Sequence, residues 1–245
     1  MTVVAVTGTS TGVGKTVTAA AIAAAARAAG GDVVVVKPAQ TGFGPDDAVD
    51  GDGAEPDTAV VGRLAQVTAI EHVRFPDPLA PLTAARRAGL CPLLRGAAGD
   101  LVRRHDRPGR LTLVEGAGGV LVRLGTDRDG TPFTLIDLAG DLAASVVVVA
   151  EPALGTLNHT ELTTRALAAA GVRCAGIVLS RWPERPGLAE RCNLTELPEL
   201  TGVPVVGRVP DGAAHLRPED FARAAQGWFE PGWIAGLGAA DIART

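Results

Sequence analysis

A run of four consecutive valines constrains the fold of this chain more than any other feature. Val33 to Val36 follow one another with no polar residue among them. A strand with one face in water alternates apolar and polar residues, so this run predicts a strand that is buried on both faces. The segment Gly14 to Ala29 is rich in alanine and ends at Gly30-Gly31, which predicts a helix with a glycine stop. These two segments are the units of a sheet that is covered by helices on both faces.

Segments of these two kinds alternate along the chain. Strands are expected at residues 2–7, 32–37, 111–115, 145–150, 173–179 and 203–206, and helices at residues 14–29, 57–65, 156–170 and 218–228. Strands that alternate with helices pair in parallel, because each helix returns the chain to the same end of the sheet. We therefore predict an α/β fold, with one domain over residues 1–245 and a mostly parallel, doubly wound sheet in three layers. Residues 42–56 are expected to form a long functional or mobile loop, and residues 125–131 a shorter exposed turn.

Composition and charge exclude several classes of partner. The formal net charge is −4 without a long basic run, which argues against nucleic acid or an anionic membrane as the main partner. The longest apolar stretches, such as Ser145 to Ala150, are too short to cross a bilayer, and the segment after Met1 does not resemble a signal peptide. The three scattered cysteines form no CxxC pair, so we expect neither a disulfide framework nor a zinc site, and we predict a cytoplasmic protein.

The segment between the first strand and the first helix has the composition of a phosphate-binding loop. It reads Gly-Thr-Ser-Thr-Gly-Val-Gly-Lys-Thr over residues 8–16. Small residues let backbone amides approach phosphate oxygens, and a helix N-terminus adds a favourable partial charge. Lys15 would reach the terminal phosphates and the Thr16 hydroxyl would contact magnesium, which makes the predicted fold P-loop NTPase-like. Five residues instead of the usual four separate Gly8 from Gly14, and a glycine-rich turn without a ligand is the alternative.

Lysine is rare in this chain. Of its 23 lysine and arginine residues only Lys15 and Lys37 are lysines. Lys37 follows the four valines at the carboxyl end of a buried strand, and ligands of parallel α/β sheets bind beyond such ends. An exposed lysine where the strand ends is the alternative. We predict that both ammonium groups face the same phosphates, and that the nearby Thr41 contacts a bound substrate.

A carboxylate follows another buried strand in the same way. Glu115 ends the strand expected at residues 111–115, and the glycines of residues 116–119 suit a backbone that passes close to a ligand. Magnesium takes oxygen ligands, usually one or two carboxylates with water and phosphate oxygens, so we predict that Glu115 holds magnesium. A solvated glutamate before a glycine turn is the alternative. For the second carboxylate we prefer Asp57, which opens a helix, over the other acidic candidates Asp46, Asp47, Asp50 and Asp52.

Four motifs together resemble the dethiobiotin synthase family. They occur at residues 7–16, 37–42, 114–119 and 154–159, in the order and spacing of that family. The resemblance covers most of the chain and fades after about Pro210, and the longer glycine spacing of the first loop is the family's own form. It implies an ATP-dependent ligase of biotin biosynthesis. Such an enzyme carboxylates 7,8-diaminopelargonic acid with carbon dioxide and closes the ureido ring through a carbamate and a carbamic-phosphoric anhydride.

The resemblance also implies roles for single residues. Lys15 and Lys37 would stabilise the carbamate and the transferring phosphoryl group, and Thr16, Asp57 and Glu115 would hold Mg²⁺. The residues expected to contact ATP are Gly12, Val13, Gly14, Lys15, Thr16, Val17, Glu115, Gly116, Ala117, Gly118, Ser180, Arg181, Pro210 and Asp211. The residues expected to contact the substrate are Thr11, Thr41, Leu154, Gly155, Thr156 and Asn158. The family works as a homodimer, in which the segment at 154–159 receives the substrate carboxylate across the subunit interface.

Three other functions fit parts of the pattern. A cobyrinic acid amide synthase would need a glutaminase to supply ammonia, and the sequence shows no nucleophilic Cys-His arrangement. An ATPase of the partitioning or maturation type usually carries an additional lysine early in the phosphate loop, and residues 9–14 contain none. A scaffold without chemistry would leave Lys37 and Glu115 at strand ends unexplained.

One position departs from the family pattern and leads to a prediction. Members commonly carry Asn-Asp after the strand at residues 173–179, where the asparagine reads the adenine edge, and this chain has Ser180-Arg181. A serine lacks the paired donor and acceptor of an amide, so we expect the enzyme to accept other nucleoside triphosphates. Turnover with ATP, CTP and GTP at equal concentration tests this. A loss of roughly 10³-fold or more without adenine, which corresponds to ~4 kcal/mol, would contradict it.

Overall fold

The computed structural model describes residues 2–44 and 55–239. Its centre is a seven-stranded sheet with the order β10-β9-β8-β1-β5-β2-β3, in which all neighbouring strands are parallel. These strands are β1 (Thr2–Gly8), β2 (Asp32–Thr41), β3 (Thr68–Phe75), β5 (Arg110–Gly119), β8 (Ser145–Ala150), β9 (Cys174–Trp182) and β10 (Val205–Pro210). A second, small sheet consists of β4 (Leu93–Leu94), β6 (Gly125–Thr126) and β7 (Pro132–Phe133).

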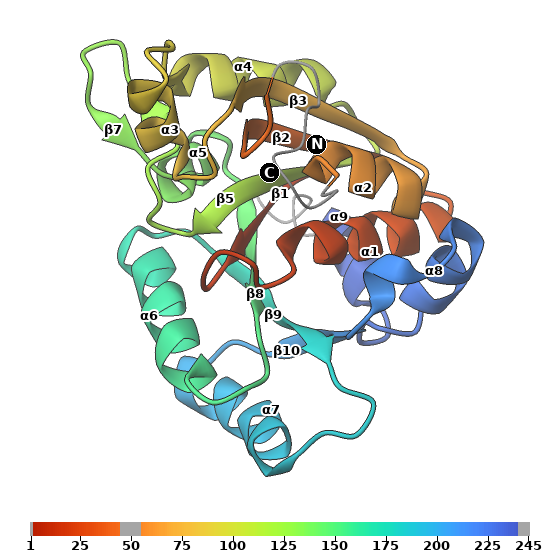
Figure 1. The fold of residues 1–245 in the computed structure, drawn as a ribbon. Coiled ribbons are helices and arrows are strands. Elements are labelled where there is room, and N and C mark those ends of the chain that lie inside the picture. Colours follow the sequence, from red (N-terminus) through yellow and green to blue (C-terminus); the bar gives the residue numbers. More distant parts are fainter. Residues whose placement is uncertain (1, 45–54, 240–245) are drawn as a thin grey trace.

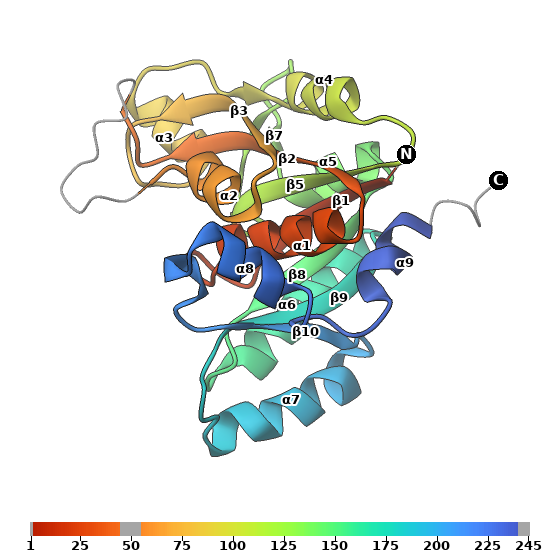
Figure 2. The same ribbon diagram turned by 90° about the vertical axis from the view of Figure 1, so that its right-hand side faces the viewer.

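Helices cover both faces of the large sheet, as Figures 1 and 2 show. One face is covered by α1 (Lys15–Ala28), α2 (Asp57–Ala65), α8 (Pro218–Ala225) and α9 (Trp233–Ala239). The other face is covered by α3 (Pro81–Arg87), α4 (Arg95–His105), α5 (Leu135–Asp141), α6 (Thr156–Ala169) and α7 (Leu188–Thr201). A short 3₁₀ turn, η1 (Ala213–His215), precedes α8. The predicted three-layer, doubly wound α/β fold is confirmed.

The valine run of β2 lies between two cores, as predicted. Val35 and Val36 are at most 1% exposed. Val35 packs in the core beneath α1, α2, α8 and α9, whereas Val36 packs in the core on the opposite face. This division follows from the two-residue period of a strand. Alanine dominates α1 for a related reason, because this helix is enclosed by the sheet, α2 and α8 and therefore has little exposed surface.

The predicted strands and helices are all present, with changes at their ends. The helix at 57–65 and the strand at 145–150 have the predicted bounds, whereas β2 and β5 continue to Thr41 and Gly119. Lys37 and Glu115 therefore lie inside strands and not at their ends. Residues 125–131, expected to be one exposed turn, begin with the buried strand β6. Most of the loop predicted at 42–56 lies outside the described residues.

Several elements were not predicted from the sequence. They are β3, β4, β6, β7, α3, α4, α5, α7 and α9. Most are short or mix apolar and polar residues without a clear period, as in β3, where only Phe75 is fully buried. Among the helices of the described residues, none combines the length and apolar character that a bilayer span requires.

Candidate active site

The loop between β1 and α1 folds closely around Gly8, the last residue of β1. A Cβ atom at Gly8 would lie 2.6 Å from Val13 Cγ2 and 2.8 Å from the carbonyl oxygen of Ser10, so only glycine fits here. Gly12 and Gly14 adopt left-handed conformations, with φ of 77° and 84°. The glycine spacing of this loop therefore has a direct steric reason.

The start of α1 presents unpaired backbone donors. The N–H groups of residues 14–17 have no acceptor within the described part of the chain, and no side chain caps the helix. Free N–H groups at a helix N-terminus, together with the helix dipole, favour the binding of an anion. The loop thus has the geometry of a phosphate site.

Lys15 extends back over this loop from the first residue of α1. Its Nζ donates a hydrogen bond to the carbonyl oxygen of Ser10 at 2.9 Å, and the residue is 7% exposed. Burial lowers the pKa of Lys15 to about 8, although the Glu115 carboxylate opposes this shift. A bound polyanion would favour the charged form of this buried amine.

The ammonium group of Lys37 lies between two carboxylates. Its Nζ is 2.5 Å from Asp57 Oδ2 and 2.9 Å from Glu115 Oε1, and it donates to the Gly116 carbonyl oxygen at 3.1 Å. Burial by itself would lower the pKa of Lys37, but the two carboxylates raise it above its ordinary value. Burial raises the pKa of Glu115 and opposes ionisation of Asp57, yet Lys37 and Thr16 hold the pKa of Asp57 below its usual range.

Thr16 joins the same cluster from the first turn of α1. Its Oγ1 lies 2.9 Å from Asp57 Oδ1 and 2.9 Å from Glu115 Oε1. Two carboxylates and a hydroxyl from α2, β5 and α1 thus bring hard oxygen donors together. The described residues contain no group of three or more His, Cys, Asp or Glu side chains that could hold a metal. Magnesium usually takes one or two carboxylates together with water and phosphate oxygens, and the three donors of this site would leave room for them.

The course of the strands explains why Lys37 and Glu115 meet. The ladder between β2 and β5 runs from Asp32↔Arg110 to Val36↔Val114 and ends there. Beyond that point β2 remains paired with β3, while β5 remains beside β1 as far as Gly8↔Gly119. Lys37 and Glu115 are the first residues after the shared ladder, where the strands separate and leave room for their side chains.

These groups line one cavity of about 690 Å³. The predicted site residues among its lining are Thr11, Gly12, Gly14, Lys15, Thr16, Val17, Lys37, Thr41, Asp57, Glu115, Ala117 and Gly118. Lining residues that the sequence analysis did not single out are Ala39, Gln40, Phe43, Glu55, Pro78, Leu79, Ala80, Pro81 and Val122. Apolar side chains predominate in this second group. Three prolines within residues 76–81 mark this wall in the sequence, but the strand before them was not recognised.

Gln40 is the most informative of the residues that were missed. It is 4% exposed, and its Oε1 accepts a hydrogen bond from the Asp57 backbone N–H at 3.1 Å. Its Nε2 donates to the carbonyl oxygen of Thr41 at 3.2 Å. Gln40 therefore connects the end of β2 to the start of α2 and helps to place the Asp57 carboxylate. The sequence gives no signal for a contact between residues so far apart in the chain.

The other predicted contact residues lie outside this cavity. Val13 and Gly116 are adjacent in the chain to residues that line the cavity. Ser180 is buried beneath the phosphate loop, and the exposed Arg181 forms an ion pair with Glu151 at 3.1 Å. Pro210 pairs with Trp182, and Asp211 N donates to the Trp182 carbonyl oxygen, so the predicted segments at 180–181 and 210–211 lie side by side. The remaining set, at the start of α6, is Leu154, Gly155, Thr156 and Asn158. Their contacts with ATP or substrate stay predictions, and the candidates Asp46, Asp47, Asp50 and Asp52 lie outside the described residues.

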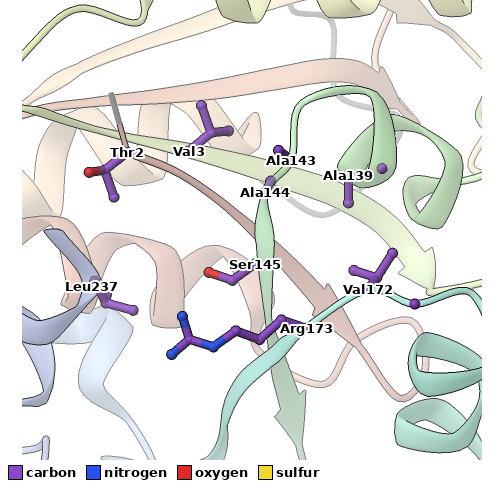
Figure 3. A pocket seen from close by; sticks show the side chains of 11 residues that line it. Thr2, Val3, Ala139, Ala143, Ala144, Ser145, Val172, Arg173 and Leu237 are labelled. Carbon is purple, nitrogen blue, oxygen red and sulfur yellow. The ribbon is translucent and has the colours of Figure 1, made fainter. Parts of the chain in front are cut away.

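A smaller cavity of about 210 Å³ lies at the amino ends of the strands, opposite to the end that carries the lysines and carboxylates (Figure 3). Thr2 and Ser145, the first residues of β1 and β8, line it together with Arg173. Parallel α/β sheets bind their ligands beyond the carboxyl ends of the strands, where the lysines and carboxylates lie. The smaller cavity is therefore not the candidate active site.

Comparison with known proteins agrees with this fold. Residues 2–217 match the model of a family described as an AAA domain. The chain is similar to a ParA family ATPase from Chlorobium tepidum, with a TM-score of 0.52, 14% identity, and coverage of 99% of this chain and 91% of that chain. It is also similar to chloroplast FtsY from Physcomitrella patens, with a TM-score of 0.51, 17% identity, and coverage of 91% of this chain and 65% of that chain. At such identities the likeness shows the fold alone, and fold and site together define a P-loop nucleotide-binding protein.

Curated relatives give the family. The ATP-dependent dethiobiotin synthetase BioD of Rhodococcus jostii is 57% identical over 236 residues, which cover 96% of this chain and 97% of the relative. The protein of the same name from Mycobacterium sp. (strain JLS) is 51% identical over 97% of this chain and 100% of its own length. That from Streptomyces coelicolor is 51% identical over 94% of this chain and 93% of its own length. The chain belongs to the dethiobiotin synthetase family, and the resemblance seen in its four motifs is confirmed.

The lowered pKa of Lys15 predicts a pH-dependent affinity for nucleotide. The ammonium form is the one that attracts phosphate, and its charge is lost as the pH rises through about 8. In metal-free buffer we expect ATP affinity to be highest below pH 8 and to fall above it, approaching about tenfold per pH unit. Calorimetry between about pH 7.5 and pH 9.5 measures this, and a Lys15→Ala variant should bind weakly without that fall. A flat profile in the unaltered protein would refute the prediction.

Proposed function

We propose that this chain acts as an ATP-dependent dethiobiotin synthetase, a ligase that forms C–N bonds in biotin biosynthesis. It carboxylates 7,8-diaminopelargonic acid with carbon dioxide and closes the ureido ring, as the names of its relatives imply. The observation that carries the site assignment is the cavity at the phosphate loop. Both lysines of the chain and the carboxylates of Asp57 and Glu115 line it together.

The chemistry requires positioned charge more than a protein nucleophile. One amine of the diamine takes up carbon dioxide and becomes a carbamate, whose oxygen attacks the γ-phosphorus of ATP and displaces ADP. The second amine then attacks the carbonyl carbon of the mixed anhydride, loses a proton, and displaces phosphate. The loop amides and Lys15 suit the phosphates. Lys37 faces the same cavity from β2 and suits the carbamate oxygens and the transferring phosphoryl group.

Magnesium fits the oxygen donors of this cavity. The Thr16 hydroxyl lies 2.9 Å from a carboxylate oxygen of Asp57 and 2.9 Å from a carboxylate oxygen of Glu115. In our proposal these three side chains would hold Mg²⁺, and the bound ion would neutralise charge on the phosphates of ATP. Lys37 now contacts both carboxylates, so it would have to give up part of these contacts to serve the carbamate.

The wall of the cavity suits the rest of the substrate. Thr11 and Thr41 supply hydroxyl groups to the cavity that both lysines line, where the diamine or carbamate would lie. Phe43, Leu79 and Val122 add apolar surface to the same lining, which fits the alkyl chain of the diamine. In a homodimer, residues 154–158 of the partner subunit would receive the distant carboxylate at the start of α6, where backbone amides favour an anion.

A homodimer is part of this proposal. Leu154, Leu162 and Leu121 are 87%, 60% and 58% exposed. Leu121 and Leu162 line a shallow hollow together with His159, next to the segment that would bind the substrate carboxylate. A second copy of the chain on this face would cover the leucines and bring residues 154–158 to the cavity of its partner.

The proposed activity has a direct test. ATP cleavage is measured with and without 7,8-diaminopelargonic acid and bicarbonate, together with the formation of dethiobiotin. We expect cleavage to require the diamine and to match product in amount, because the carbamate is the phosphoryl acceptor. Hydrolysis of ATP at the same rate without the diamine would favour a P-loop ATPase instead.

Loss of the Lys37 ammonium should reduce turnover strongly. We expect Lys37→Ala to lower kcat by roughly 10²-fold or more, as loss of a preorganised charge partner typically does. Arg104→Ala is a suitable control, since it removes an exposed cation of α4 outside the cavity. Circular dichroism shows whether both variants are folded. Near-normal turnover in folded Lys37→Ala protein would remove Lys37 from the reaction.

A further inference from the structure

Ser180 occupies a buried position directly beneath the phosphate loop. It belongs to β9 and is 2% exposed, although serine side chains are mostly exposed in proteins. Its hydroxyl donates a short hydrogen bond to the carbonyl oxygen of Val13, and the carbonyl oxygen of Ala150 lies 3.4 Å away. Ser180 thus connects β9 to the phosphate loop through its hydroxyl group.

The contact between Ser180 and the loop is close as well as polar. A Cβ atom at Gly14 would lie 3.0 Å from Ser180 Cβ and 3.1 Å from its Oγ. Val13, the residue before Gly14, packs with Val6, Ala19 and Val149 in a small separate core. The peptide between Val13 and Gly14 is therefore held in place by the packing of Val13 and by the hydrogen bond from Ser180.

This arrangement determines where the Gly14 N–H points. No peptide bond of the described chain is cis, and in a trans peptide the C=O and N–H groups point in opposite directions. The Val13 carbonyl points down to Ser180, so the N–H of Gly14 points to the other side. Gly14 lines the large cavity, and this N–H has no acceptor within the described residues.

We propose that Ser180 is a positioning residue for phosphate binding, whose hydroxyl fixes the peptide between Val13 and Gly14 so that the Gly14 N–H faces the nucleotide phosphates. The inference rests on the proposed nucleotide binding at this loop. A serine hydroxyl has one proton to donate, and here that proton is used by the Val13 carbonyl. Through the Gly14 N–H, Ser180 therefore affects the binding of the phosphates, which all nucleoside triphosphates share, and not the recognition of the base.

The test compares ligands that share phosphates but differ in the base. Affinities for ATP, CTP and inorganic tripolyphosphate are measured by calorimetry for the unaltered protein and for Ser180→Ala. The alanine leaves the buried Val13 carbonyl without its donor, so we expect all three affinities to fall by the same factor, about tenfold, which corresponds to ~1.4 kcal/mol. The amide resonance of Gly14 should also shift less on addition of tripolyphosphate.

Thr18→Val is the matched control. Thr18 lies in α1, and its hydroxyl is buried without a partner among the described residues. Replacing that hydroxyl by a methyl group of similar shape removes a buried polar group near the loop without removing a hydrogen bond, so tripolyphosphate affinity should stay within about twofold. Melting temperatures without ligand show that both variants are folded.

Two results would overturn the proposal. The first is unchanged tripolyphosphate affinity and an unchanged Gly14 resonance in folded Ser180→Ala protein. The second is a loss that depends on the base, which would place Ser180 at the base instead. Neither result bears on the proposed function, which fails if the unaltered protein forms no dethiobiotin or hydrolyses ATP at the same rate without the diamine.

Discussion

The contact of the Lys37 ammonium with the carboxylates of Asp57 and Glu115 is the interaction on which the rest of the site depends. A buried charge is strongly unfavourable unless partners of opposite charge surround it. Lys37 and Glu115 are both nearly inaccessible to solvent, and their partners come from β2, β5 and α2. The three elements must therefore be correctly placed before Lys37 and Glu115 can both be ionised at low cost. Thr16 adds α1, and with it the phosphate loop, to the same network.

Two other arrangements support this network from outside the cavity. Gln40 binds the first peptide of α2 and so helps to position Asp57. On the far side of the loop, the ends of β8 and β9 provide the surface on which the loop rests: Thr9 N donates to the Val149 carbonyl oxygen, and Ser180 contacts Val13 and Gly14. The loop is thus fixed by hydrogen bonds of its backbone on one side, which leaves the N–H groups on the other side free for an anion.

The strongest local patterns in the sequence were sufficient to predict much of this molecule. The valine run, the alanine-rich helix and the glycine loop between a strand and a helix predicted the sheet, its layers and the position of the phosphate site. Lys37 and Glu115 were expected at strand ends and lie instead where two strands stop pairing with each other. Predicting that separation requires knowing that β2 pairs with β3, a strand whose residues lack a clear period.

The sequence by itself determined the fold class, the family and the identity of the charged side chains, because these depend on local composition and on motifs whose residues are close together in the chain. Only the tertiary structure decided which groups meet. Asp57 reaches Lys37, Gln40 reaches the start of α2, and the apolar wall after β3 closes the cavity. Each of these contacts joins segments that are far apart in sequence. Their positions follow from strand order and from the packing of helices on the sheet, which no local pattern encodes.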